Sequence, residues 1–174
     1  MGLLDEAIEW KPNKLGSSDN YFVDADTLSN KDGSKRYRLS GYNAAEVEKI
    51  VDGKFKQGTA GGSRTTEIIS SLANKEGFTN IKPLRNPDGS IKTDMYGREL
   101  IDLTNDKGES FNTALLGAGV FDISKYSSEG DVILRDLARA ERKNRVMSGN
   151  AEASAFDQAA FDVKTAEAEA GAKS

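Results

Sequence analysis

Short runs with the composition of β-strands, separated by tight-turn signals, occupy most of residues 21–105 and limit the folds open to this chain. The first two runs flank Asp32-Gly33, a dipeptide typical of a β-hairpin turn. Further turn signals at 85–90 and 106–108 separate the later runs. The pattern therefore predicts a small and mostly antiparallel sheet.

Helical segments are predicted between and after these strands. An apolar stripe over 63–77 predicts a helix with Ser63 as its N-cap, and Ser110 is placed to cap a short helix that ends near Gly119. A longer helix begins around Ser128 or Asp131. The fold class that follows is α+β, and five strands with about three helices favour a Greek-key barrel of the OB type.

The two ends of the chain differ from its middle. Residues 1–20 combine a few large apolar side chains with acids, which suggests a docking arm in front of a domain over 21–149. Residues 150–174 are rich in Ala and Glu and nearly lack branched aliphatics, so we expect them to build no core. They are predicted to be a helical or disordered tail, or the start of a longer protein.

The composition excludes several classes of chemistry. The chain has no Cys and no His, which removes Cys nucleophiles, His-based nucleases and the usual zinc sites. Carboxylates, Lys, Tyr, Arg and oxygen-ligated hard cations remain available. The 24 basic and 28 acidic residues give a net charge of −4, so no global positive field attracts nucleic acid. Any phosphate chemistry must therefore be local.

Neither a membrane span nor an export signal is predicted. No apolar run approaches the roughly 18 residues of a transmembrane helix. Residues 1–10 carry acids where a secretory signal has Lys or Arg. We expect a soluble protein without a signal peptide or membrane contact, in the cytoplasm or associated with a virion, and monomeric as an isolated domain.

The helix predicted after Ser128 carries the one cluster of basic residues in the chain. One of its faces holds Val132, Ile133, Leu137 and Ala140. Its basic residues are Arg135, Arg139, Arg142, Lys143 and Arg145. The simpler interpretation is a solvated face with pairs four residues apart, and the alternative is a face that contacts a substrate.

Carboxylates, an amide and two guanidinium groups stand at the ends of predicted strands. If the first two strands are neighbours, Asp26 comes beside the loop that holds Asn43 and Glu46. Oxygen atoms gathered there suit a hard cation such as Ca²⁺. Arg38 and Arg98 each offer a planar fork that matches the oxygens of a phosphodiester. These residues predict phosphodiester chemistry in which Glu46 orients water.

The order and spacing of these segments resemble the staphylococcal nuclease family, also called thermonuclease-like domains. The resemblance covers about residues 21–149. It rests on VDADTL, RYRLSGYNAAEV, DMYGREL, SFNTALLGAGVF and a helix containing LARAERKNR, in that order. It implies an OB fold and a calcium-dependent endonuclease that hydrolyses DNA or RNA.

The resemblance implies a metal site. Asp26 stands at a calcium ligand of the family, and Asp24 stands at the acid behind it. Asn43 occupies the position of the second carboxylate ligand, and Ala44 supplies a backbone carbonyl. The ion implied is Ca²⁺, with other divalent cations as alternatives.

The resemblance also implies catalytic roles. Glu46 stands at the proposed general base, and Arg38 and Arg98 stand at the two arginines that stabilise the phosphate. Tyr96 stands at the aromatic residue beside the nucleotide.

Several positions depart from the family pattern. Asn43 replaces an Asp and so removes one negative charge, which lowers the expected affinity for calcium. Ala44 and Ala45 replace Thr and Pro, and Met95 replaces a Lys. Two functions stay open: a metal-dependent nuclease, or a weakened or inactive nuclease-like domain that has lost its metal. The second would bind nucleic acid or serve as an interaction module of a larger, for example phage-encoded, protein.

Overall fold

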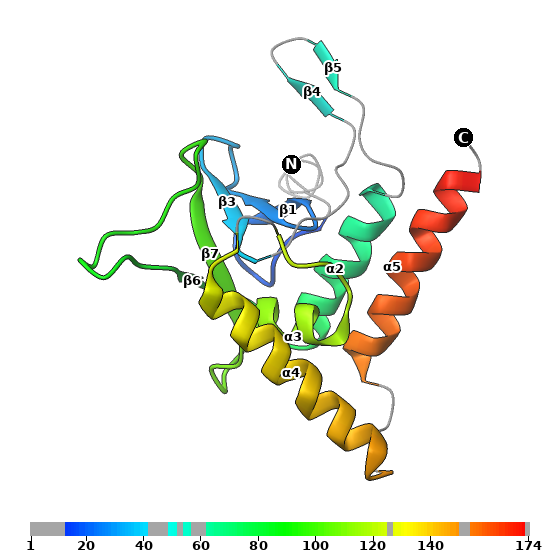
Figure 1. Cartoon of the computed structure of the whole chain (residues 1–174). Helices are drawn as coiled ribbons and strands as arrows, with labels where there is room; N and C mark the ends of the chain where they lie inside the picture. Colours follow the sequence, from blue (N-terminus) through cyan, green and yellow to red (C-terminus); the bar gives the residue numbers. More distant parts are fainter. Residues whose placement is uncertain are drawn as a thin grey trace.

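The computed structural model describes residues 13–41, 49–51, 54–56, 62–124, 127–149 and 154–172 (Figure 1). Within these ranges the chain is an α+β structure with a five-stranded mixed sheet, a separate two-stranded hairpin and four helices. The strands of the sheet are β1 (Tyr21–Asp24), β2 (Thr27–Ser29), β3 (Arg36–Leu39), β6 (Asn80–Pro83) and β7 (Glu99–Thr104). The remaining elements are β4 (Lys49–Val51), β5 (Lys54–Lys56), α2 (Gly62–Lys75), α3 (Phe111–Ala118), α4 (Glu129–Met147) and α5 (Ala155–Ala172).

The strands follow the spatial order β1-β2-β3-β7-β6. Neighbours are antiparallel except β3 and β7, which run parallel with Arg38 opposite Leu100. A parallel pair cannot be joined by a tight turn, so the chain between these two strands makes a long crossover that includes α2 and β6. The predicted five-stranded, mostly antiparallel sheet is confirmed.

Local signals in the sequence set most of the turns and helix ends. Gly33 adopts φ +78° in the turn between β2 and β3, a conformation that favours glycine. The side chain of Ser110 caps α3, and Ser128 forms a reciprocal capping box with Asp131 at the start of α4. The prediction of Ser63 as an N-cap was wrong, because α2 begins at Gly62 and Ser63 lies within its first turn.

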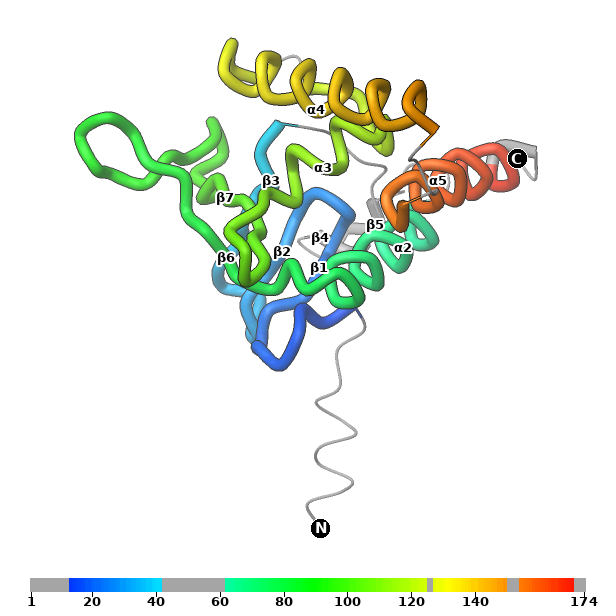
Figure 2. The backbone as a smooth tube through the Cα atoms, turned by 90° about the horizontal axis from the view of Figure 1, so that it is seen from below, coloured from blue at the N-terminus to red at the C-terminus, as the bar shows by residue number. Residues whose placement is uncertain are grey.

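Helices α2 and α3 pack against the sheet, and α5 packs along α2 on the side away from the sheet, as Figure 2 shows from below. The buried apolar residues of these layers form one core. Three rings link these layers: Phe78, after α2, Phe111 in α3 and Phe156 in α5. Their centroids lie 5.3 to 5.9 Å apart, and the two pairs that involve Phe156 meet edge to face. The aromatic contacts therefore tie the C-terminal helix to the rest of the fold.

The expectation that residues 150–174 build no core was wrong. Helix α5 packs along α2, and Val163 together with Ala159, Ala160 and Ala166 is buried there. Small side chains let two helices approach closely, so a stripe of Ala can fill an interface without large aliphatic residues. Within the described residues this helix is the fourth, where about three helices were predicted. Every helix in the described ranges falls short of the length or apolar character that a membrane span requires.

Candidate functional site

Strands β2 and β3 bring Asp26 and Arg38 together. Asp26 lies in the turn between β1 and β2, and Arg38 pairs in register with Thr27, the next residue. Nη2 of Arg38 lies 3.4 Å from Oδ2 of Asp26, with the two side chains 14% and 10% exposed. Nη1 of Arg38 also donates to the backbone carbonyls of Leu39 at 2.7 Å and Asp26 at 3.3 Å. The guanidinium is thus held in place by both charge and backbone.

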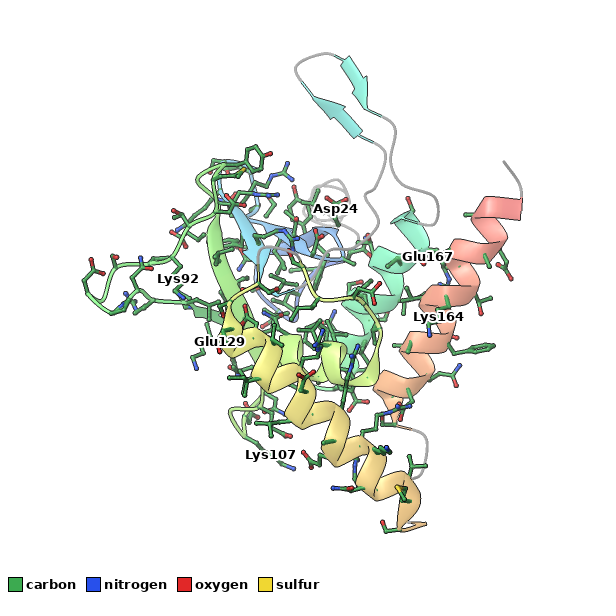
Figure 3. All side chains as sticks on the ribbon, viewed as in Figure 1. Asp24, Lys92, Lys107, Glu129, Lys164 and Glu167 are labelled. Carbon is green, nitrogen blue, oxygen red and sulfur yellow. The ribbon has the colours of Figure 1, made fainter. Side chains whose placement is uncertain are left out.

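The turn that carries Asp26 concentrates acidic oxygen. Asp24, labelled in Figure 3, ends β1, and both carboxylates are largely buried. The hydroxyl of Thr27 donates to Oδ1 of Asp26 at 2.9 Å. A carboxylate has about four acceptor positions, so Asp26 can accept from Thr27 and pair with Arg38 at the same time.

The chain leads from this pair directly into the segment with the other predicted ligands. The backbone N–H of Leu39 donates to the carbonyl of Asp26 at 2.8 Å, which joins the turn to the end of β3. The carbonyl of Gly41 then accepts from Ser124 N at 2.8 Å and from Ser127 Oγ at 3.0 Å. The backbone is therefore anchored up to two residues before position 43.

Three of the predicted site residues, Asn43, Ala44 and Glu46, lie outside the described residues. Their roles remain predictions. Within the described ranges, no group of three or more His, Cys, Asp or Glu side chains is arranged to hold a metal ion. The predicted calcium set draws most of its donors from 43–46, so Asp26 and Asp24 are the members whose positions are known.

Arg98 and Tyr96 lie together in the turn that precedes β7. Nε of Arg98 donates to Oδ2 of Asp94 at 2.7 Å, and the guanidinium carbon lies 5.5 Å from the centroid of the Tyr96 ring. Oδ1 of Asp94 accepts from the backbone N–H groups of Tyr96 and Arg98, both at 2.9 Å. The turn thus orients Arg98 through a residue that the sequence analysis did not select.

The ionisation of Asp94 reflects these contacts. Burial alone raises the pKa of the Asp94 carboxyl, but hydrogen bonds from the backbone and side chain of Arg98 and from Tyr96 outweigh it. The pKa is left below its ordinary value. Asp94 is therefore a carboxylate at neutral pH and a permanent partner for Arg98.

The register of β3 and β7 relates the two arginines. Leu100 lies opposite Arg38, and Arg98 precedes Leu100 by two residues, so strand alternation puts both arginines on the side away from the core residues Leu39 and Ile101. The offset along the strand is about 7 Å. Their ion pairs differ, however: Arg38 pairs with Asp26, and the contacts of Arg98 fall within its own turn.

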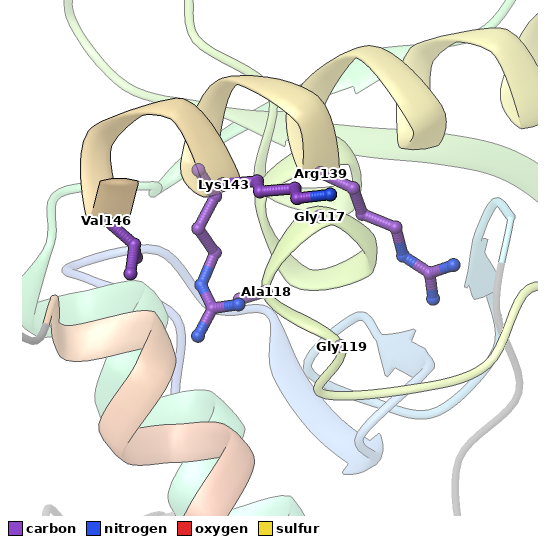
Figure 4. Close-up of a pocket in the computed structure, with 7 residues that line it drawn as sticks. Gly117, Ala118, Gly119, Arg139, Lys143 and Val146 are labelled. Carbon is purple, nitrogen blue, oxygen red and sulfur yellow. The ribbon is translucent and has the colours of Figure 1, made fainter. Parts of the chain in front are cut away.

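A basic cleft of about 470 Å³ lies between the end of α3 and α4 (Figure 4). Its lining residues are Gly117, Ala118, Gly119, Arg139, Arg142, Lys143 and Val146. None of them is acidic. Arg142 forms an ion pair with Asp157 of α5, whereas Arg139 and Lys143 have no ion pair with any described residue.

Helices α3 and α4 approach closely beside this cleft because Gly117 of α3 has no side chain. A Cβ atom at Gly117 would lie 2.6 Å from Cβ of Ala138, closer than real contacts allow. The chain leaving Gly119 runs on to Ser124, which donates to Gly41. A Cβ atom at Gly41 would lie 3.3 Å from the side chain of Leu116, so α3 contacts the backbone that enters the predicted 43–46 loop.

No protein-family model matches this chain, and no curated protein matches its sequence. The resemblance to the nuclease family therefore depends on the motifs quoted above. The described geometry adds two arginine–carboxylate pairs and a basic cleft to those motifs.

We expect the carboxyl of Asp94 to titrate below the ordinary Asp range, and Arg98→Ala to raise its midpoint because a charge and a hydrogen bond are lost. Since the folded pKa is depressed, the interaction stabilises the fold above the unfolded pKa and is lost as pH falls through the folded value. Carboxyl ¹³C chemical shifts followed against pH measure the Asp94 midpoint in the unaltered protein and in Arg98→Ala. Asp88, whose pKa is lowered by hydrogen bonds from Ser90, is the control that Arg98→Ala should not shift. An unchanged Asp94 midpoint in Arg98→Ala would contradict the assignment.

Proposed function

We propose that this chain is a metal-dependent nuclease of the staphylococcal nuclease type that hydrolyses phosphodiester bonds in DNA or RNA. The observation that carries the proposal is the largely buried pair of Asp26 and Arg38. The pair places Asp26, an oxygen donor for a hard metal cation, beside Arg38, whose guanidinium can bind phosphate. The 42–48 segment follows β3, the strand that carries Arg38. The sequence predicts that this segment carries the remaining ligands and the base.

The sheet supports the proposal at the level of the fold. Five strands with three antiparallel neighbour pairs and one parallel pair are compatible with the partly open Greek-key barrel of an OB fold. OB folds bind oligonucleotides and oligosaccharides through their strands and loops. We take the OB barrel as part of the proposal.

The proposed metal site uses hard oxygen donors. Asp26 and Asn43 would supply side-chain oxygens and Ala44 its carbonyl, and Asp24 stands at the acid that the resemblance implies behind these ligands. Ca²⁺ or another divalent cation bound there would neutralise phosphate charge and polarise the scissile bond. The donor set fits such an ion because carboxylate, amide and carbonyl oxygens are the ligands that Ca²⁺ prefers.

The protein groups carry out the rest of the reaction. Glu46 accepts a proton from water as the water oxygen bonds to phosphorus. Arg38 and Arg98 stabilise the charge that develops on the phosphoryl oxygens while the bond to the leaving oxygen breaks. Asp94 positions Arg98, and Tyr96 stacks beside the nucleotide. The leaving oxygen takes a proton from solvent and Glu46 returns its proton to solvent, which yields two nucleic-acid ends.

The basic cleft supplies local positive charge that the acidic chain otherwise lacks. Arg139 and Lys143 face a groove free of acidic lining residues and have no ion pair with described residues. Leu116, the residue before Gly117 of the lining, lies next to Gly41, where a Cβ atom would be 3.3 Å from its side chain. A polynucleotide bound at the catalytic residues could therefore extend its phosphates along this cleft.

A weakened or inactive nuclease-like domain is the second candidate. It is favoured by the two arginine pairs themselves, because Asp26 and Asp94 already balance Arg38 and Arg98 without metal or phosphate. Asn43 in place of a carboxylate acts in the same direction. In this case the same surface binds nucleic acid without cutting it, or serves as an interaction module.

Cleavage of single-stranded DNA and RNA with Ca²⁺ tests the first candidate. We expect Glu46→Gln and Arg98→Ala each to lower the rate by about 10²-fold or more, since each removes a group that acts in the transition state. Arg64→Ala is the matched control, because Arg64 is in an exposed pair with Glu67 on α2. Absence of cleavage by the unaltered protein with Ca²⁺, Mg²⁺ and Mn²⁺ would refute the nuclease and leave the binding module.

The cleft is tested separately by binding without cleavage, in chelator, using a fluorescent single-stranded oligonucleotide. Arg139→Ala with Lys143→Ala should weaken binding and reduce the slope of log affinity against log salt by about 1.4, since each phosphate contact contributes about 0.7 on single strands. Removing two cations from α2, Arg64→Ala with Lys75→Ala, is the control. Equal slopes for the two double variants would show that the cleft does not contact the phosphates of the oligonucleotide.

A further inference from the structure

The apolar face of helix α4, which a helix normally buries against the core, is exposed to solvent. Ile133, Leu134, Leu137 and Met147 are 52%, 51%, 62% and 76% exposed. No residue of the helix is fully buried. Figure 2 shows α4 at the outer edge of the molecule, with α3 on its inner side. An amphipathic helix with its apolar side exposed typically marks a site where another protein surface binds.

The inner side of the same helix is not the apolar one. Ala138 packs against Gly117 of α3, and Arg135 and Arg142 are the more covered side chains beside it. Arg142 reaches across to Asp157 of α5. The contact with the rest of the fold therefore uses mainly small and basic residues, and Ile133, Leu137 and Met147 are left largely exposed.

The apolar positions follow a coiled-coil spacing. The seam, which we define as Ile133, Leu137, Ala140, Asn144 and Met147, has intervals of four, three, four and three residues. This is the repeat of about 3.5 residues that places each side chain toward one neighbouring helix. A single polar residue in such a seam, here Asn144, commonly fixes register. The spacing thus predicts one helix as the partner of α4.

The charges along α4 indicate which helix that is. Residues 129–137 contain three acids and one base, whereas 138–147 contain four bases and one acid. A second copy of the helix in antiparallel orientation would lay each acidic half against a basic half. A parallel copy would instead bring Asp136 close to Glu141, a repulsive pair. The helix is therefore complementary to itself in one orientation.

We propose that α4 pairs with α4 of a second copy of this chain to form an antiparallel, two-fold symmetric dimer. Leu137 packs opposite Ala140 and Ile133 opposite Asn144. Lys143, which lies at the edge of the basic cleft, turns its flexible side chain from the cleft to Asp136 of the second copy when the dimer forms. This replaces the expectation of a monomeric domain. A single helix pair lies at the small end of specific interfaces, so we expect a reversible dimer.

Sedimentation equilibrium over a range of protein concentrations tests the dimer. The unaltered chain should shift from monomer to dimer, and Ile133→Ser with Leu137→Ser should remain monomeric. Phe161→Ser is the matched control, because Phe161 is 65% exposed on α5 and lies off the seam. Circular dichroism confirms that each variant is folded, which exposed substitutions permit. A concentration-independent monomer, or a dimer that survives the serine pair, would overturn the proposal.

Charge reversal tests the orientation. Asp136→Lys or Lys143→Asp alone should weaken the dimer by about tenfold, because each change sets like charges opposite one another twice. The two changes together should restore it. Loss of dimer in the double variant would contradict the pairing.

A distance measurement gives an independent reading of the orientation. The chain has no Cys, so Ser148→Cys accepts a single nitroxide label at the end of α4. In the antiparallel dimer the two labels lie about 28 Å apart, given a rise of about 1.5 Å per residue. A parallel pair would bring them within roughly 10 Å, and that result would refute the arrangement.

Discussion

The parallel pairing of β3 with β7 is the constraint on which the rest of the structure depends. It joins the hairpin strands β1–β3 to the β6–β7 pair and requires a crossover long enough to contain α2. Its register sets Arg38 opposite Leu100, which lies two residues after Arg98. Beyond the end of β3, Gly41 meets Ser124, the chain that leaves α3. Arg38 therefore lies on one strand of this pair and Arg98 directly before the other, and the chain that leaves α3 is bonded to the end of β3.

Features set by local interactions could be predicted from the sequence, and features set by packing could not. Ser110 and Ser128 cap helices because each bonds a backbone N–H three residues ahead, which a short motif encodes. Helix α5 enters the core only because α2 offers a surface that its Ala stripe fits. Neither the composition of that segment nor its weak amphipathic pattern contains information about α2.

The candidate site divides in the same way. Asp26 and Arg38 meet because adjacent strands bring them together, and adjacency follows from the turn signal at Gly33. Asp94 was missed, although an Asp side chain that accepts from the backbone N–H two residues later is a recognisable turn motif, and this motif could have identified it. The cleft with Arg139 could not be predicted, because it exists only where α4 packs against Gly117. The metal ligand Asn43 and the base Glu46 remain predictions from the motifs.

The central claim is that a divalent cation binds where the Asp26 turn meets the segment after Gly41. Anomalous X-ray scattering from crystals soaked in Mn²⁺ tests it most directly, because the signal locates the ion itself. The account predicts a peak about 2–2.6 Å from a carboxylate oxygen of Asp26, with oxygens of residues 43–46 completing its shell. A well-ordered 42–48 segment with no peak beside Asp26 would contradict it.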